Sequence, residues 1–292
     1  MRLKRSALFA AIIAVLLSAA GAAYVWLDRW QRSAIFSIEL GEARWAREPL
    51  PGTEIFDLPL SGGQTIRAWY VSGPSPDAPT VLYLHGSRWN LNSSVFRMER
   101  WVDMGYSMLA IDYRGFGEST ELLPSQASAV EDAQAALREL ERRQPDPARR
   151  FVYGHSLGGA VAVALAADAE PGSFAGLILE STFTSIREMI AASRWRNVPG
   201  LHWIITQPFD SLSRIAHVRQ PILFIHGTGD SVVPHAMSDA LYEAASGRDG
   251  GKQSLAKIES ASHSGASRSP GYAEAVREFT GVVVTEAGSP PL

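Results

Sequence analysis

Short apolar runs alternate with stretches of helical periodicity along most of the chain. The runs are continuous rather than alternating, which favours strands that are covered on both faces, as in a parallel sheet. Helical spacing of apolar residues follows Ser125, and an Ala-, Val- and Leu-rich stretch extends from Gly158 to about Glu170. This alternation predicts an α/β fold with a mostly parallel central sheet and helices on both faces. The predicted strands lie at residues 66–71, 81–84, 107–111, 150–153, 177–179, 222–225 and 255–258.

A separate apolar pattern occupies the N-terminus. Residues 1–5 include three basic side chains, and an uncharged run follows over residues 6–27. At about 1.5 Å per residue, a helix of this length crosses a bilayer. The basic cap and the aromatic Tyr24, Trp26 and Trp30 predict a signal anchor, with residues 1–5 in the cytoplasm and the catalytic domain on the extracytoplasmic side of the membrane. The alternative is a cleaved signal peptide and a secreted domain.

After the apolar run, the sequence pattern divides the rest of the chain into a stalk, an α/β domain and a tail. Residues 28–50 are polar and arginine-rich, which predicts a stalk, and the α/β domain is expected over residues 51–284. Residues 181–220 break the rhythm of short loops, so we expect a small cap inserted into the domain there. The end of the chain, residues 285–292, contains Gly, Ser and Pro and predicts a flexible tail.

The composition narrows the function classes. Of the 292 residues, 46% are hydrophobic, which excludes disorder as the main state. A net charge of −3 gives no electrostatic footprint for nucleic acid. Because the sequence has no cysteine, thiol catalysis, disulfides and cysteine-ligated metal clusters are excluded.

A G-x-S-x-G motif stands between a predicted strand and a predicted helix, at residues 154–158. This context is that of a nucleophile elbow, in which a strained turn projects the serine hydroxyl above the sheet. Ser156 is therefore predicted as a catalytic nucleophile. The backbone amide of Leu157, at the helix N-terminus, is predicted to stabilise the negative charge that develops on the substrate.

Together with further motifs, this elbow resembles the α/β hydrolases. The resemblance is closest to the BEM46-type group, which includes the ABHD12, ABHD13 and ABHD17 branches, and serine aminopeptidase (S33) domains share these motifs. It extends over about residues 54–279 and implies an α/β-hydrolase fold. The motifs that carry it are YLHG at 83–86, DYRGFGES at 112–119, GHSLGG at 154–159, ESTFTS at 180–185 and HGTGDSVVP at 226–234.

The resemblance implies a chain order of nucleophile, acid and histidine. A serine hydroxyl needs a base, and the base needs an orienting acid. Asp230 follows the run at 222–225 and His263 follows the run at 255–258, so both stand at predicted carboxyl ends of strands. We therefore expect a catalytic triad of Ser156, Asp230 and His263.

Other acids and histidines remain alternatives. Glu180 ends a predicted strand at the place where a few hydrolases carry their acid, and Asp112 is expected to support the loop that follows it. His155 is expected to point away from the elbow, and His226 to be structural. His235 is a further candidate base.

The loop after the YLHG motif and the cap complete the predicted site. The fold implies a second oxyanion donor in that loop, for which we expect the amide of Ser87, with Arg88 as the alternative. A cap over the nucleophile would hold an acyl group with Phe183, Trp195 and Trp203. The alternative is that these side chains only pack onto the sheet. Arginines in the cap could contact lipid headgroups beside the anchor.

The sequence thus predicts a membrane-anchored serine hydrolase that cleaves a carboxylic ester or thioester through an acyl-enzyme. The resemblance adds lipid and acyl substrates. Acyl transfer and proton transfer need no cofactor, and no metal is predicted, because no helical spacing supports the set of His226, Asp230 and His235 as metal ligands. The expected partners are a small-molecule ester and the membrane, with no nucleic acid. A peptidase, an acyltransferase and a non-catalytic binding protein remain alternatives.

Overall fold

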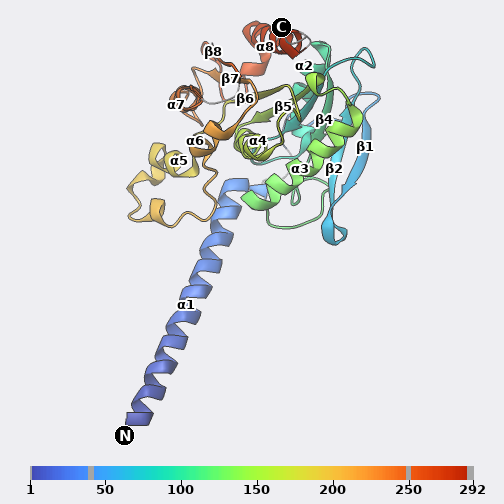
Figure 1. Cartoon of the computed structure of the whole chain (residues 1–292). Helices are drawn as coiled ribbons and strands as arrows, with labels where there is room; N and C mark the ends of the chain where they lie inside the picture. The colour runs from blue at the N-terminus through green and yellow to red at the C-terminus, as the bar shows by residue number, and fades with distance from the viewer. Residues whose placement is uncertain (1, 39–42, 248–250, 288–292) are drawn as a thin grey trace.

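The computed structural model of the protein describes residues 2–38, 43–247 and 251–287, and the side chains of residues 9–38, 43–247 and 251–281. In this part of the chain, one long N-terminal helix leads into an α/β domain (Figure 1). The side chains of the predicted basic cap, residues 1–5, lie outside the described residues.

A central sheet organises the domain, and within the described residues it has eight strands in the order β1-β2-β4-β3-β5-β6-β7-β8. The pairs β1–β2 and β2–β4 are antiparallel, and all other neighbours are parallel. The predicted mostly parallel sheet is confirmed. The strands are β1 (Glu54–Pro59), β2 (Thr65–Val71), β3 (Thr80–Leu84), β4 (Ser107–Ile111), β5 (Arg150–His155), β6 (Gly176–Glu180), β7 (Ile222–Gly227) and β8 (Gln253–Ile258).

Burial explains which strands the hydrophobic pattern could predict. Strands β3, β4 and β6 are buried at every position, as expected where helices cover both faces. Strand β1 was not predicted. Its side chains are mostly exposed and it pairs with β2 at the edge of the sheet, so it has no continuous apolar run.

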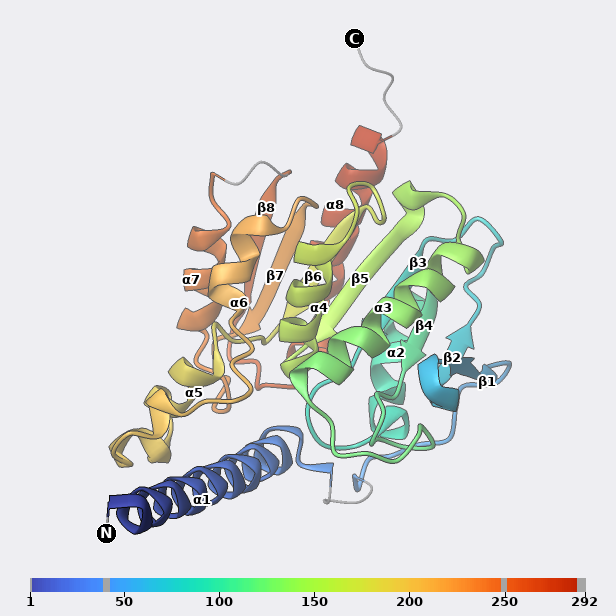
Figure 2. The ribbon, with the colours of Figure 1, turned by 60° about the horizontal axis from the view of Figure 1, so that its bottom comes forward.

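Two hydrophobic cores, one on each face of the sheet, hold the helices. Helices α3, α4 and α7 contribute buried side chains to one core, and α2 and α8 contribute to the other. Figure 2 shows the sheet between these layers. The helices are α1 (Arg2–Phe36), α2 (Val95–Asp103), α3 (Gln126–Arg143), α4 (Leu157–Asp168), α5 (Ile186–Ala192), α6 (Ser211–Arg214), α7 (Ala236–Ala244) and α8 (Pro270–Ala287).

Helix α1 extends from the domain like a stem (Figure 1). By length and composition, its segment Phe9–Phe36 can cross a membrane. The helix does not end at residue 27 as expected but continues to Phe36, which is fully buried against Phe116 and Phe209. The first part of the expected stalk, residues 28–36, is therefore a helix docked into the domain.

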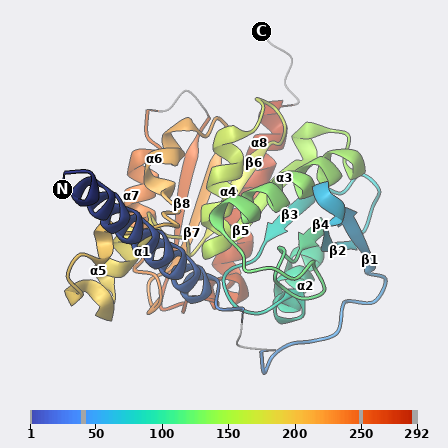
Figure 3. The same cartoon turned by 90° about the horizontal axis from the view of Figure 1, so that it is seen from below.

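The expected cap, residues 181–220, lies between β6 and β7 and contains α5, several 3₁₀ turns and α6. It protrudes from the domain beside α1 (Figures 2 and 3). The side-chain amide of Gln31 donates to the carbonyl of Ile204 at 2.7 Å, and the N–H of Thr206 donates to the Gln31 side chain at 2.9 Å. These bonds join the cap to the helix.

Helix α8 changes the expected C-terminal boundary. Residues 285–287 belong to this helix rather than to a flexible tail. The rest of the expected tail, residues 288–292, lies outside the described residues.

Candidate active site

Ser156 occupies the sharp turn between β5 and α4. Its backbone has a φ of 55° and a ψ of −121°, a positive-φ conformation that is rare for a residue with a side chain and is typical of strain at a functional turn. Its N–H donates to the carbonyl of Glu180 at 2.9 Å. Gly158 is required because a Cβ there would lie 2.0 Å from the carbonyl oxygen of Leu84. The strand–turn–helix context predicted for Ser156 is present.

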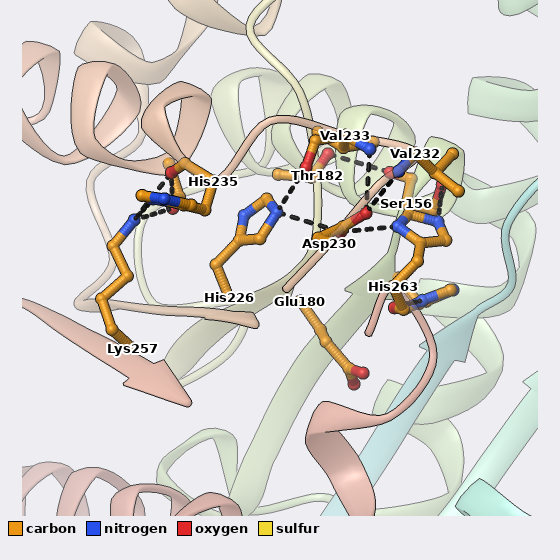
Figure 4. A network of polar contacts seen from close by, with 12 residues as sticks. Ser156, Glu180, Thr182, His226, Asp230, Val232, Val233, His235, Lys257 and His263 are labelled. Carbon is orange, nitrogen blue, oxygen red and sulfur yellow. Dashed lines mark hydrogen bonds and ion pairs between the residues drawn. The ribbon is translucent and has the colours of Figure 1, made fainter. Parts of the chain in front are cut away.

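The structure brings Ser156, His263 and Asp230 into one hydrogen-bonded chain (Figure 4). The Ser156 hydroxyl lies 3.0 Å from Nε2 of His263. Nδ1 of the same ring lies 2.8 Å from Oδ2 of Asp230. Because a carboxylate only accepts, Nδ1 carries the proton and Nε2 is left to accept one from Ser156. This tautomer is the one that a general base needs.

Asp230 is held as an anion by four donors. Its Oδ1 accepts from the N–H groups of Val232 and Val233 at 2.8 and 2.9 Å. Its Oδ2 accepts from His263 and from His226, whose Nε2 lies 3.1 Å away. Burial alone would raise the pKa of Asp230, but the bonds from His226, His263 and Val233 outweigh it and hold the pKa well below its usual value.

The role of His226 was not anticipated from the sequence. Its buried Nε2 lies 3.1 Å from both Oδ2 of Asp230 and the carbonyl of Val233, so this nitrogen carries the proton and points at the carboxylate. The only sequence signal is its position four residues before Asp230, at the end of β7. His226 therefore contacts the acid directly rather than serving only the fold.

The rival acids lie away from His263. The Glu180 carboxylate is fully buried, accepts from the Tyr153 hydroxyl and lies 3.4 Å from the Arg97 guanidinium. Figure 4 shows it pointing away from the histidine. Asp112 is buried directly after β4 and accepts from the N–H of Leu91 at 3.0 Å, and burial raises its pKa to about 8. Neither acid contacts the base.

The rival histidines are also engaged elsewhere. Nε2 of His155 donates to the backbone carbonyl of His263 at 3.1 Å, so His155 faces away from the Ser156 hydroxyl and toward the loop of His263. Burial lowers the pKa of His155 well below its usual value. His235 lies at the surface, where the Lys257 ammonium contacts its ring and its carbonyl. Within the described residues, no three His, Asp or Glu side chains are grouped so that they could hold a metal ion.

The expected oxyanion donors stand beside Ser156. Leu157 is the first residue of α4, where backbone N–H groups have no partner within the helix. Ser87 lines the same cavity as Ser156 and Leu157. The N–H of Arg88, the alternative donor, is used by the carbonyl of Phe36 at 2.8 Å. The geometry therefore favours Ser87 over Arg88.

An apolar cavity of about 290 Å³ lies over one side of Ser156. Its walls come from the cap, with Phe183, Met189 and Trp195, and from the docked end of α1, with Trp30 and Ile35. The sequence analysis did not expect α1 to line the site, because residues 28–50 were interpreted as a stalk.

Trp203, expected to hold substrate, lies outside this cavity. Its side chain is 76% exposed and contacts His202 and the Arg187 guanidinium. Of the three expected cap residues, the structure places Phe183 and Trp195 at the cavity and leaves Trp203 at the outer surface.

A second cavity, of about 450 Å³, lies on the other side of Ser156 and is more polar. Its walls include Arg88, Asn90, His155 and His263. The two cavities meet at Ser156. His263 lines the second cavity and not the first.

Known proteins with similar sequences and structures place this chain in a family. The family model of serine aminopeptidases, S33, matches residues 75–214. The uncharacterized protein Rv2307c of Mycobacterium tuberculosis is 34% identical over 251 residues, which cover 84% of this chain and 85% of that protein. The lysophosphatidylserine lipase ABHD12 of Danio rerio is 31% identical over 196 residues, 61% of this chain and 50% of the lipase, so the chain matches about half of that relative.

Solved structures agree on the fold. The Pyrococcus furiosus esterase Pf2001 superposes with a TM-score of 0.65 at 17% identity, and the match covers 83% of this chain and 99% of the esterase. Identity this low supports the fold alone. The sequence matches, together with this shared fold, show that the chain belongs to the α/β-hydrolase family and is an ABHD-like hydrolase.

Proposed function

We propose that this hydrolase is a serine hydrolase that cleaves a carboxylic ester or thioester through an acyl-enzyme. The observation that carries the proposal is the chain of two hydrogen bonds, 3.0 and 2.8 Å long, from Ser156 through His263 to Asp230. It stands at the junction of an apolar and a polar cavity.

The geometry supports a two-step reaction. His263 Nε2 takes the hydroxyl proton while Ser156 Oγ attacks the carbonyl carbon, and the oxyanion lies against the amides of Leu157 and Ser87. His263 then gives its proton to the leaving oxygen or sulfur as the acyl–heteroatom bond breaks. Water, deprotonated by the same nitrogen, releases the acid from Ser156. Asp230 holds the His263 tautomer and stabilises its charged form throughout.

The two cavities suggest where each part of the substrate lies. The leaving group receives its proton from His263, so it belongs in the polar cavity that His263 lines. The acyl group then occupies the apolar cavity, whose walls include Phe183, Met189 and Trp195. An acyl chain in this cavity would contact the end of α1 as well as the cap.

A series of p-nitrophenyl esters from about two to sixteen carbons tests the proposal on the full chain, with Ser156→Ala as the control. We expect turnover by the parent that rises with chain length as the apolar cavity fills, and none by the variant. Equal turnover by both proteins would contradict the assignment of Ser156. A flat profile would contradict the acyl cavity.

A peptidase is the second candidate, because the matched family model is that of serine aminopeptidases. Aminoacyl p-nitroanilides test it under the same conditions. Turnover of these amides above that of the esters would favour the peptidase.

The N-terminal helix supports a further part of the proposal. We propose that α1 anchors the chain in a membrane, with the catalytic domain on the extracytoplasmic side, because its uncharged run, residues 6–27 of the sequence, is long and apolar enough to span the bilayer. Protease treatment of sealed cells expressing the full chain tests the side. Digestion of the domain from outside supports this orientation, and protection until the cells are opened would contradict it.

A further inference from the structure

The outer face of the cap carries exposed apolar side chains beside α1. Trp195, Val198, Trp203 and Ile204 are between 41% and 76% exposed. Clustered large apolar side chains at a surface mark a contact site. Trp195 also packs edge-on against Trp30 of α1, with ring centroids 6.3 Å apart, so this face is attached to the helix.

Helix geometry shows where this face lies along the axis of α1, relative to the end of the uncharged run. Gln31, which holds the carbonyl of Ile204, is four residues beyond Leu27, the last residue of the uncharged run. Four residues correspond to about 6 Å along a helix axis. Tyr24 and Trp26, which are 61% and 67% exposed, lie within the last turn of that run, as aromatic residues do at a membrane–water interface. The cap face and the aromatic end of the run therefore stand at one level.

Arginines accompany the apolar side chains. Arg187, Arg194 and Arg196 are exposed, and in the part of the chain that the structure describes none of them forms an ion pair with an acidic side chain. The Arg187 guanidinium lies 5.9 Å from the ring centre of Trp203, and that of Arg194 lies 5.2 Å from that of Trp195. Long cationic side chains next to tryptophan suit a surface where an apolar layer meets phosphate groups.

We propose that the cap face, residues 194–204, inserts its apolar side chains into the headgroup region of the membrane that α1 crosses. The apolar cavity, whose walls include the packed pair Trp30 and Trp195, then lies beside the lipid surface, and the acyl chain of the substrate enters it from the membrane rather than from water. The contact rests on the proposed anchor, and the entry route rests also on the proposed ester hydrolysis.

Fluorescence of single labels tests the contact independently of activity. The chain has no cysteine, so Trp203→Cys and Glu170→Cys each introduce one thiol for an environment-sensitive dye. Residue 170 is exposed in the loop before β6, at the amino-terminal ends of the parallel strands, whereas Ser156 lies at their carboxyl ends, so it serves as the matched control. In phosphatidylcholine vesicles, we expect nitroxide-labelled phosphatidylcholine to quench the dye at position 203 and not at position 170. Equal quenching, or none, would overturn the proposal.

Flotation and activity separate this proposal from the two on which it rests. A full chain that does not float with the vesicles would contradict the anchor and the contact together. In a chain that floats, Val198→Ser/Trp203→Ser should lower turnover of a long-chain ester dissolved in the vesicles roughly tenfold, because apolar contacts with lipid are lost. Turnover of p-nitrophenyl acetate in water should stay unchanged. Equal turnover of the vesicle ester by parent and variant, or equal losses on both esters, would overturn the entry route.

Discussion

His226 and Asp230 form a direct hydrogen bond, in which Nε2 of the histidine lies 3.1 Å from Oδ2 of the aspartate. The same oxygen lies 2.8 Å from Nδ1 of His263. One carboxylate oxygen is therefore fixed by two imidazole donors, while the backbone of Val232 and Val233 fixes the other oxygen. His226 thus acts as a positioning residue for the acid that orients the proposed base.

Replacing His226 with phenylalanine keeps a ring in the buried site and removes the donor. A hydrogen bond to a charged group contributes about 1.5–3 kcal/mol, so we expect kcat on a p-nitrophenyl ester to fall by roughly ten- to a hundredfold, with little change in KM. His235→Phe, at the surface, is the matched control and should keep the parent rate. An unchanged kcat in His226→Phe would show that Asp230 needs no second imidazole.

The acid can be assigned by comparing two carboxamide substitutions. Asp230→Asn should lower kcat by about four orders of magnitude, because it favours the wrong histidine tautomer. Glu180→Gln should spare much of the rate and lower the free energy of unfolding by about 3–5 kcal/mol, because Arg97 loses its buried partner. Steady-state kinetics and thermal unfolding measure both effects. A reversed pattern would transfer the role of acid to Glu180.

Asp112 makes stability depend on pH with a definite sign. Burial raises its folded-state pKa to about 8 from an ordinary value of 3.8. Between these two values the folded protein keeps a proton that the unfolded chain has lost, so the contribution of Asp112 to the free energy of unfolding falls as the pH rises. Asp112→Asn cannot titrate and keeps an oxygen for the N–H of Leu91. Thermal unfolding at several pH values should show that the Tm of the variant, relative to that of the parent, rises from about pH 5 to about pH 8. Parallel Tm curves would argue against a raised pKa.

The apolar cavity predicts how chain-length preference can be shifted. Met189 lines the cavity, whereas Ala192 is exposed on the same helix and does not. Met189→Trp should fill part of about 290 Å³ and reduce kcat/KM for long-chain esters while leaving the shortest ester little affected. Ala192→Trp adds the same bulk outside the cavity and should keep the parent profile. If both variants show the same profile, the acyl group lies elsewhere.

Much of the fold could be predicted because its strands are covered on both faces. The run at 107–111 coincides with β4, the run before the elbow falls within β5, and the apolar stretch after the elbow overlaps α4, which ends two residues earlier than expected, at Asp168. The edge strand β1 could not be predicted in this way, since its exposed side chains give no apolar run. Hydrophobic patterning detects buried strands, and most side chains of β1 are exposed.

Other features depend on contacts that link distant parts of the chain. Ser156, Asp230 and His263 could be predicted from motif context and chain order, and the structure brings their side chains together. The docking of Phe36 into the domain could not, because residues 28–36 are polar enough to suggest a stalk. Their partners, such as Phe116 and Phe209, lie far along the sequence. The outward position of Trp203 was missed for a related reason: an aromatic residue in a cap suits a pocket wall and a membrane face equally well.

Active-site labelling tests the central claim, that His263 and Asp230 activate Ser156, most directly. The full chain is treated with a fluorophosphonate, beside Ser156→Ala and His263→Ala, and the modified peptide is located by mass spectrometry. We predict rapid labelling of the parent at Ser156, no labelling of Ser156→Ala, and slow labelling of His263→Ala, because the hydroxyl is a weak nucleophile without its base. Equal labelling rates for the parent and His263→Ala, or labelling of a different serine, would contradict the account.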